Sequence, residues 1–199
     1  MHTVRIPHFG LTQALTTVEP VDWSDFSSHS RIDSTGDSAL VTLYLRAARQ
    51  LVENDSHRAL VNRTVTCQLD RFPAGRDVLW LPKPPLVSVA SITYVDTAGA
   101  STTMASTDYV VDTRSMPGRV QPRYGSVWPS AQQRLGAVTL TYTAGYGAAS
   151  TDVPETDRQA IRMLVGHWYE HREAVGDVPK EMEFAYTTLV RSGDLGDMW

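Results

Sequence analysis

Apolar residues in the middle of the chain recur at every second position, with polar residues between them. The alternation is clearest at 63–69 and 138–143, and a period of two is typical of a strand with one buried face. Further candidate strands lie at 77–81, 87–95 and 108–111. Proline- and glycine-containing stretches separate these segments and are expected to form loops and turns. The pattern predicts a β-region.

Helical spacing flanks this β-region on both sides. A short helix is expected within 21–32 and a longer one at 37–53, entered through residues with side-chain oxygens that can cap its first turn. A third helix should begin at Pro154, with acidic residues in its first turn, and stop at Gly176. A fourth should run from about Pro179 to Gly193. Residues before position 18 are weakly patterned and are expected to form an arm or an edge strand.

The apolar positions assign a buried face to each long helix. For the helix at 37–53 this face comprises Leu40, Leu43, Tyr44, Ala47, Ala48, Leu51 and Val52, with Arg49 and Glu53 elsewhere on the cylinder. The third helix has a stripe of Ala160, Ile161, Leu164, Val165 and Trp168. The last helix places Met182, Ala185, Tyr186, Leu189 and Val190 on one side. Phe184 lies off that side and indicates a second contact surface.

These elements predict an α+β fold, in which a bundle of about four helices holds an antiparallel β-insertion in the middle of the chain. The expected parts are an N-terminal arm at 1–19, a helical core from 20–61 and 148–191, and the β-insertion at 62–147. The last part is a C-terminal docking tail at 192–199. This tail alternates flexible residues with the large apolar side chains Leu195, Met198 and Trp199. It can bury little alone, so we expect a partner molecule to cover it.

Composition narrows the possible functions. The net charge is −4 and basic residues do not cluster, so the chain lacks the electrostatic footprint of a nucleic-acid binder. No apolar run reaches the length of a membrane span or follows the N-terminus as in an export signal, which predicts a protein made and kept in the cytoplasm. The lone Cys67 sits at an inward position of a predicted strand, where a small buried hydrophobe is expected.

One motif points to catalysis. The segment from His167 to His171 has the pattern H-x-x-E-H, in which two histidines one helical turn apart bind zinc with a carboxylate beside them. A zinc hydrolase also needs a third protein ligand, and no later segment offers a clear one. The histidines also continue the apolar row of their helix. We therefore expect no catalytic residue, metal or cofactor, and keep a zinc-dependent hydrolase as an alternative.

Several stretches together resemble the head-to-tail connector, or head-completion adaptor, family of bacteriophages, in the subgroup with a β-insertion. They are Leu-Arg-Ala-Ala-Arg-Gln-Leu-Val-Glu at 45–53, Leu-Trp-Leu-Pro-Lys-Pro-Pro-Leu-Val-Ser-Val at 79–89, Ile-Thr-Tyr-Val-Asp at 92–96, Asp-Tyr-Val-Val-Asp at 108–112, Trp-Pro at 128–129, residues 138–147, and His-Trp-Tyr-Glu-His-Arg-Glu at 167–173. Their order and spacing over 20–191 carry the resemblance. His171 departs from it, since a polar amide is more usual there, and the N-terminal arm has no counterpart.

The resemblance implies a structural virion protein without enzymatic activity, assembled as a dodecameric ring at the neck between the capsid portal and the tail. Its partners would be the portal protein, neighbouring copies of itself, and the next head-completion, stopper or tail protein. DNA would pass through the ring without sequence-specific binding, and no membrane is involved. The C-terminal helix and tail would dock on the portal through Met182, Phe184, Tyr186, Leu189, Leu195, Met198 and Trp199. A tail-associated binding module built on the β-region is a further alternative.

Overall fold

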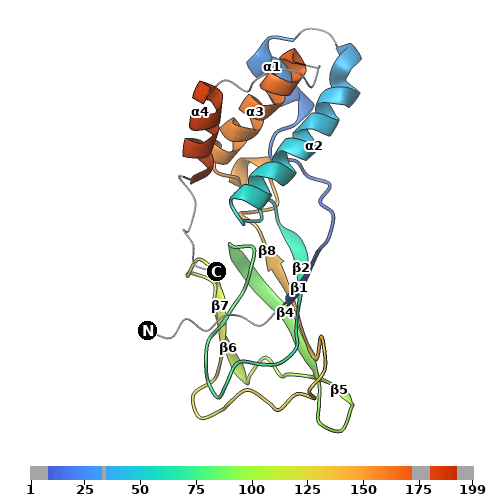
Figure 1. The fold of residues 1–199 in the computed structure, drawn as a ribbon, viewed down its shortest axis with the longest axis vertical. Coiled ribbons are helices and arrows are strands. Elements are labelled where there is room, and N and C mark those ends of the chain that lie inside the picture. Colours follow the sequence, from blue (N-terminus) through green and yellow to red (C-terminus); the bar gives the residue numbers. More distant parts are fainter. Residues whose placement is uncertain (1–8, 33–34, 172–179, 192–199) are drawn as a thin grey trace. The chain divides into compact units, whose positions relative to one another are not determined.

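The computed structural model describes residues 9–32, 35–171 and 180–191 (Figure 1). These residues divide into two compact units. The β unit consists of 9–15 and 62–145, and the helical unit consists of 16–61 and 146–191. The expected arm and docking tail stay predictions, because most of the arm's first half and the whole tail lie outside the described residues.

The larger sheet of the β unit has five antiparallel strands in the order β1-β2-β8-β4-β5. Their bounds are Phe9–Gln13 for β1, Arg63–Leu69 for β2, Leu86–Val95 for β4, Ser101–Thr103 for β5 and Val138–Ala144 for β8. The register places Cys67 opposite Leu140, and Leu140 opposite Ile92. Strand β1 pairs with β2 at the sheet margin, so of the two forms expected for the N-terminal segment, Phe9–Gln13 adopts the edge strand.

The predicted alternation is confirmed in the two central strands. Every second residue of β2 and β8 is buried, among them Cys67 and Leu140. Burial raises the pKa of the Cys67 thiol to about 12, so this side chain behaves as a hydrophobe at neutral pH. Tyr142 is also buried, and its hydroxyl donates a 2.6 Å hydrogen bond to the Pro82 carbonyl. The phenol of Tyr142 therefore leaves no unpaired hydroxyl in the core of the β unit.

A second antiparallel sheet in the β unit has the order β3-β7-β6. Its strands are β3 at Leu79–Trp80, β6 at Tyr109–Asp112 and β7 at Arg119–Pro122. Gly118, just before β7, must be a glycine, since a Cβ there would lie 2.3 Å from that of Leu86. The predicted proline and glycine breakers all fall between strands, as expected. Two short strands, β5 and β7, were not predicted from the sequence.

The helical unit contains four α-helices among its described residues (Figure 1). They are α1 at Trp23–Ser30, α2 at Ser38–Asp55, α3 at Glu155–Glu170 and α4 at Lys180–Arg191, with 3₁₀ turns η1 at Thr35–Asp37 and η2 at Ser150–Asp152. Asp22 caps α1, as its side chain accepts a 2.8 Å hydrogen bond from the Asp25 N–H. The four helices and antiparallel sheets confirm the predicted α+β fold. None of the described helices is long and apolar enough to span a bilayer.

Helix α3 begins after Pro154, as predicted, and buries Ala160, Ile161, Leu164 and Val165 of its predicted stripe, while Trp168 is half-buried against the same core. It ends at Glu170, earlier than expected, and Gly176 lies outside the described residues. The core of the helical unit joins this stripe to residues of the other helices, such as Phe26, Leu45 and Val190.

The buried face predicted for α2 was right for Ala48 and Val52 but wrong for three other residues. Leu43 is 61% exposed and Leu51 37%, and Ala47 is also exposed. The residues that α2 does bury are Val41, Leu45, Ala48, Arg49, Val52 and Glu53. The prediction excluded Arg49 and Glu53 as charged residues, and so it moved the face towards the leucines on the other side.

Two substitutions in α2 test the corrected face. Leu45→Ala should lower the free energy of unfolding by about 2–5 kcal/mol, because it opens a cavity among buried side chains. Leu43→Ala makes the same chemical change two residues earlier on an exposed position, and should cost about 0.5 kcal/mol or less. Urea unfolding followed by helical circular dichroism measures both. Equal losses would contradict the assignment of the buried face.

Candidate interaction surface

A buried ion pair lies at the centre of the helical unit. Both Asp157 carboxylate oxygens, on α3, accept hydrogen bonds from the Arg58 guanidinium, at 2.8 and 3.0 Å. The arginine also donates to the Tyr146 hydroxyl at 2.7 Å and to the Val190 carbonyl, on α4, at 3.5 Å. Burial opposes the charge of Arg58, but Asp157 and Tyr146 outweigh it and raise the pKa of Arg58. Burial also raises the pKa of Asp157, although the charge and hydrogen bonds of Arg58 oppose that rise, and the bidentate contact favours the charged form of both partners.

A second polar group explains the burial of charged residues on α2. Arg49 donates to Glu53 at 2.8 Å and to Glu19 at 2.7 Å. The other oxygen of Glu53 accepts the backbone N–H of Leu60 at 3.0 Å. These contacts attach the segments before and after α2 to one face of the helix. Each buried charge is paired and hydrogen-bonded, which is the condition under which burial is tolerated.

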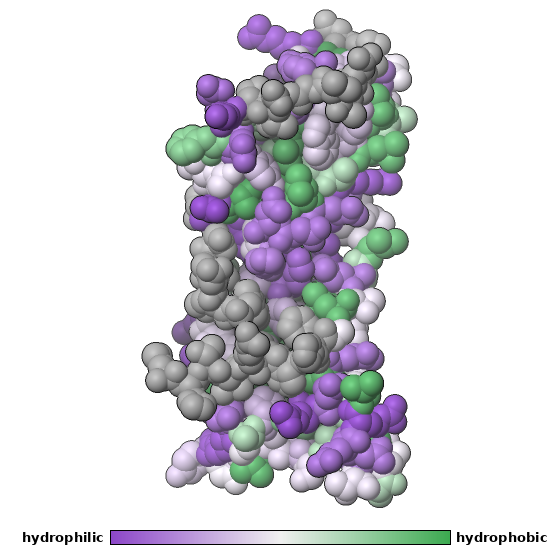
Figure 2. Space-filling view, viewed as in Figure 1, coloured by the Kyte–Doolittle hydropathy of each residue, from purple (hydrophilic) through white to green (hydrophobic). Residues whose placement is uncertain are grey.

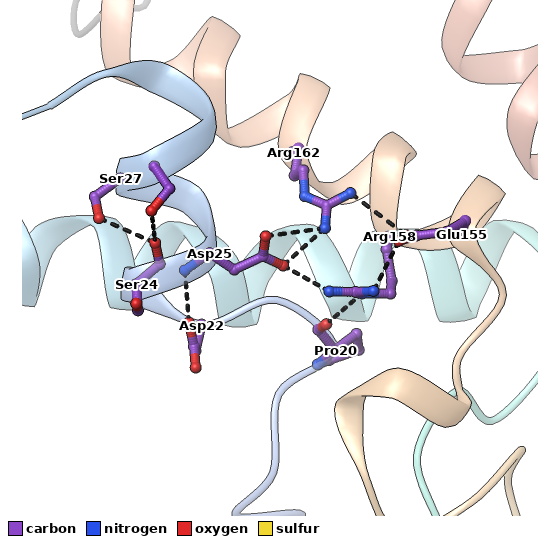
Figure 3. A network of polar contacts seen from close by, with 9 residues as sticks. Pro20, Asp22, Ser24, Asp25, Ser27, Glu155, Arg158 and Arg162 are labelled. Carbon is purple, nitrogen blue, oxygen red and sulfur yellow. Dashed lines mark hydrogen bonds and ion pairs between the residues drawn. The ribbon is translucent and has the colours of Figure 1, made fainter.

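A third polar network joins α1 to α3 (Figure 3). Both Arg158 and Arg162 on α3 donate to the Asp25 carboxylate at 2.7 Å. Arg158 also reaches the Pro20 carbonyl at 3.0 Å and Glu155 at 2.8 Å. Burial opposes ionisation of Asp25, but the hydrogen bonds and charges of Arg162 and Arg158 outweigh it and hold its pKa below the ordinary value. The network fixes α1 against α3.

Two tyrosines connect the remaining helix ends. The Tyr169 hydroxyl, near the end of α3, donates to Asp37 at the start of α2 at 2.8 Å. The Tyr186 hydroxyl on α4 donates to Asp55 at the end of α2 at 2.6 Å. Burial and the nearby Asp55 carboxylate raise the pKa of Tyr186. Helices α3 and α4 are thereby both fixed to α2, and the helical unit presents its outward residues from a rigid base.

The docking residues expected on α4 have different environments. Met182, Tyr186 and Leu189 are half-buried and pack against the core of their own unit. Phe184 is 75% exposed and lies off that side of the helix, as the sequence indicated. Leu195, Met198 and Trp199 lie outside the described residues. Among the described docking residues, Phe184 is therefore the one placed to reach another molecule directly.

Exposed hydrophobic side chains also occur elsewhere. The helical unit exposes Leu43 and Leu51 on α2, and Figure 2 shows hydrophobic residues at the right-hand edge of this unit, over α2. In the β unit the exposed apolar residues are Leu15, Val87, Val110, Met116, Tyr124, Val127 and Leu135. The sequence pattern missed the α2 positions as surface residues, because it assigned them to the core. The signal that could have revealed them is the Arg49 and Glu53 pair, four residues apart on the true buried side.

The histidines of the H-x-x-E-H motif stack on each other at the end of α3. Their ring centroids lie 4.6 Å apart, and the His171 ring nitrogen Nδ1 lies 3.2 Å from the His167 carbonyl oxygen. His171 and Glu170 are exposed. Within 9–32, 35–171 and 180–191, no group of three or more potential ligand residues is arranged to hold a metal ion. The third ligand that a zinc hydrolase requires is thus not present among these residues.

Comparison with solved structures gives matches over almost the whole chain. A chain from the neck of an empty gene transfer agent (GTA) particle, computed with C6 symmetry, is 26% identical, with a TM-score of 0.75; the match covers 96% of this chain and 100% of that one. A chain from the virion of a native GTA particle is also 26% identical, with a TM-score of 0.74 and coverage of 95% and 99%. The chain has the fold of GTA neck proteins. A third match, from the neck of a native GTA particle computed with C12 symmetry, has 26% identity, a TM-score of 0.72 and coverage of 96% and 100%.

These matches confirm the resemblance to phage-type neck connectors that the sequence stretches indicated. No protein-family model matches the chain, and no curated protein matches its sequence. The neck-protein likeness extends through both the helical unit and the β unit, since the match leaves only 4% of the chain uncovered.

The polar network of Figure 3 predicts that the stability lost on substitution of Asp25 depends on pH. Asp25→Asn should destabilise the helical unit at neutral pH, because it removes the charge that two arginines face. The folded-state pKa of Asp25 is lowered, so its contribution is complete above the ordinary value of 3.8 and is lost as the pH falls through the lower folded value. The difference from wild type should therefore shrink below about pH 4.

Chemical unfolding of both proteins between pH 3 and pH 7 measures this difference. Asp22→Asn is the matched control, since it makes the same charge change on the same helix and asparagine caps a helix as well as aspartate does. A difference for Asp25→Asn that stayed constant down to pH 3 would contradict the ion-pair account.

Proposed function

We propose that this chain is a non-enzymatic neck protein that assembles as a ring between the portal and the tail of a phage-like particle. The observation that carries the proposal is the match over 96% of this chain and the whole of a chain from a GTA particle neck, at 26% identity. Two of the matched structures are necks computed with C6 and C12 symmetry. Cyclic symmetry of that kind supports a ring for this chain, with a closed head-to-tail contact between copies.

The chemistry of the chain supports a structural role. Its buried ionisable side chains, such as Arg58 and Asp157, bind each other inside the helical unit. The buried Cys67 thiol has a raised pKa of about 12, which disfavours the nucleophilic thiolate. The exposed groups are apolar side chains and mixed charges, which suit protein contacts. A net charge of −4 suits a channel through which DNA slides without being held.

Docking on the portal is proposed to use the C-terminal helix and the residues after it. Phe184 is exposed on α4, and a large aromatic side chain is a frequent anchor of a protein interface. Met182, Tyr186 and Leu189 support it by fixing α4 to the helical core. Leu195, Met198 and Trp199 would extend the same contact. The opposite face of the ring would receive the next head-completion or tail protein.

Portal binding tests this proposal. Phe184→Glu and truncation after Ser192 should each weaken binding to the purified portal protein of the same particle, while leaving the helical circular dichroism unchanged. Co-sedimentation of the chain with the portal measures the effect. Val110→Glu is the matched control, because Val110 is also an exposed apolar residue, 53% exposed, but lies in the β unit.

Wild-type chain that fails to sediment with the portal would overturn the proposed function. Wild-type binding that both variants retain would instead overturn the docking role of the C-terminal helix and the residues that follow it.

A further inference from the structure

Helix α2 carries an apolar line on its outward side. Ala39, Leu43, Ala47 and Leu51 are spaced four residues apart, which places them in one row along the helix. All four are exposed, and the row is about 18 Å long. We call these four residues the outer stripe. The opposite side of α2 is buried in the helical core through residues such as Leu45 and Val52.

The outer stripe does not contribute to the core of its own helical unit, because its side chains are exposed. A helix that covers one core needs one apolar face, and its other side is normally polar. Helix α2 instead has leucines and alanines on both sides, so its outward row suits contact with another protein surface. The rigid attachment of α2 through Glu53 and Tyr186 excludes turning the stripe inward.

The surface suited to receive it lies on α3. Gly166 lies opposite the buried stripe of α3 at the helical spacing of 3.6 residues per turn, and a Cβ placed there would meet nothing within 4 Å. Gln159 and Met163, on the same side, are half-buried. The absence of a side chain at Gly166 lets a second helix approach closely, with Met163 as an apolar neighbour. We call these three residues the α3 outer face.

The closure of a ring favours contact between two different faces. Arg46 beside the outer stripe is paired with Glu19 of its own copy, and Glu155 on α3 is paired with Arg158 and Arg162, so charge does not decide which surfaces meet. A contact between two outer stripes would be the same on both copies and would stop at a dimer, whereas a contact between two different faces can continue around a ring.

We propose that the outer stripe of one copy binds the α3 outer face of a second copy of this chain, as the lateral contact of a ring. The two surfaces lie on opposite flanks of the helical unit, since α2 and α3 pack against each other through their buried sides. Two different patches on opposite flanks give a head-to-tail contact, which closes into a ring when the rotation fits. This inference rests on the proposed function, because the closed ring is part of that proposal.

Disulfide trapping tests the contact directly. A chain carrying Leu43→Cys and Gly166→Cys should form a ladder of disulfide-linked oligomers when oxidised with copper phenanthroline at high protein concentration. Each single variant alone should form no ladder. The native Cys67 is buried with a raised pKa, so it does not compete. Both positions are open to solvent, so the folded unit accepts the cysteines.

A chain with Leu43→Cys and Thr188→Cys is the matched control, because Thr188 is exposed on α4. A ladder from this control but not from the Leu43 and Gly166 pair would overturn the proposal. So would dimers of the Leu43→Cys single variant, which would indicate contact between two stripes. No ladder from any pair would overturn it as well.

Complementation gives an independent readout in sedimentation velocity. Leu43→Glu and Gly166→Trp should each abolish self-association. An equimolar mixture should recover dimers and no larger species, because only one intact stripe and one intact α3 outer face can meet. Self-association of Leu43→Glu equal to that of the wild type, or a mixture without dimers, would contradict the proposal. Portal binding by the wild type tests the proposed function separately, so the two can fail independently.

Discussion

The buried pair of Arg58 and Asp157 is the interaction on which the helical unit depends. Arg58 follows α2, Asp157 lies on α3, and the same guanidinium contacts Tyr146 and the last turn of α4. One side chain thus joins four segments that are up to 132 residues apart in the sequence. Each charge is compensated only if all these segments are in place, because an unpaired buried charge is strongly destabilising. The pair therefore selects one arrangement of the helices.

The ion pairs of the helical unit also determine which of its apolar side chains are exposed. Arg49, Glu53 and Glu19 occupy one side of α2, and this directs Leu43 and Leu51 outward. Tyr186 fixes α4 so that Phe184 projects from it. The internal ion pairs thereby determine which hydrophobic side chains are available to other molecules. This coupling explains how the helical unit presents defined apolar side chains to solvent.

Local sequence patterns predicted most of the fold. Ion pairs between residues far apart in the sequence determine which side chains are buried in the helical unit, and local patterns did not predict them. The period of two located β2 and β8, and helical spacing located all four helices, because burial acts through local periodicity. Strands β5 and β7 have three and four residues, too few to show a period. The face of α2 was assigned wrongly because Arg49 is buried only through Glu19, a partner 30 residues away. No local pattern reveals the pairing of Arg58 with Asp157, which are 99 residues apart.

The central claim is that copies of this chain surround a channel at the neck of a particle. Electron microscopy of the purified chain bound to its portal tests this most directly. The account predicts a closed ring of copies on the portal, in cyclic symmetry, with the helical units of adjacent copies in contact through α2 and α3. Single copies bound separately to the portal, or a ring whose subunits touch only through their β units, would contradict it.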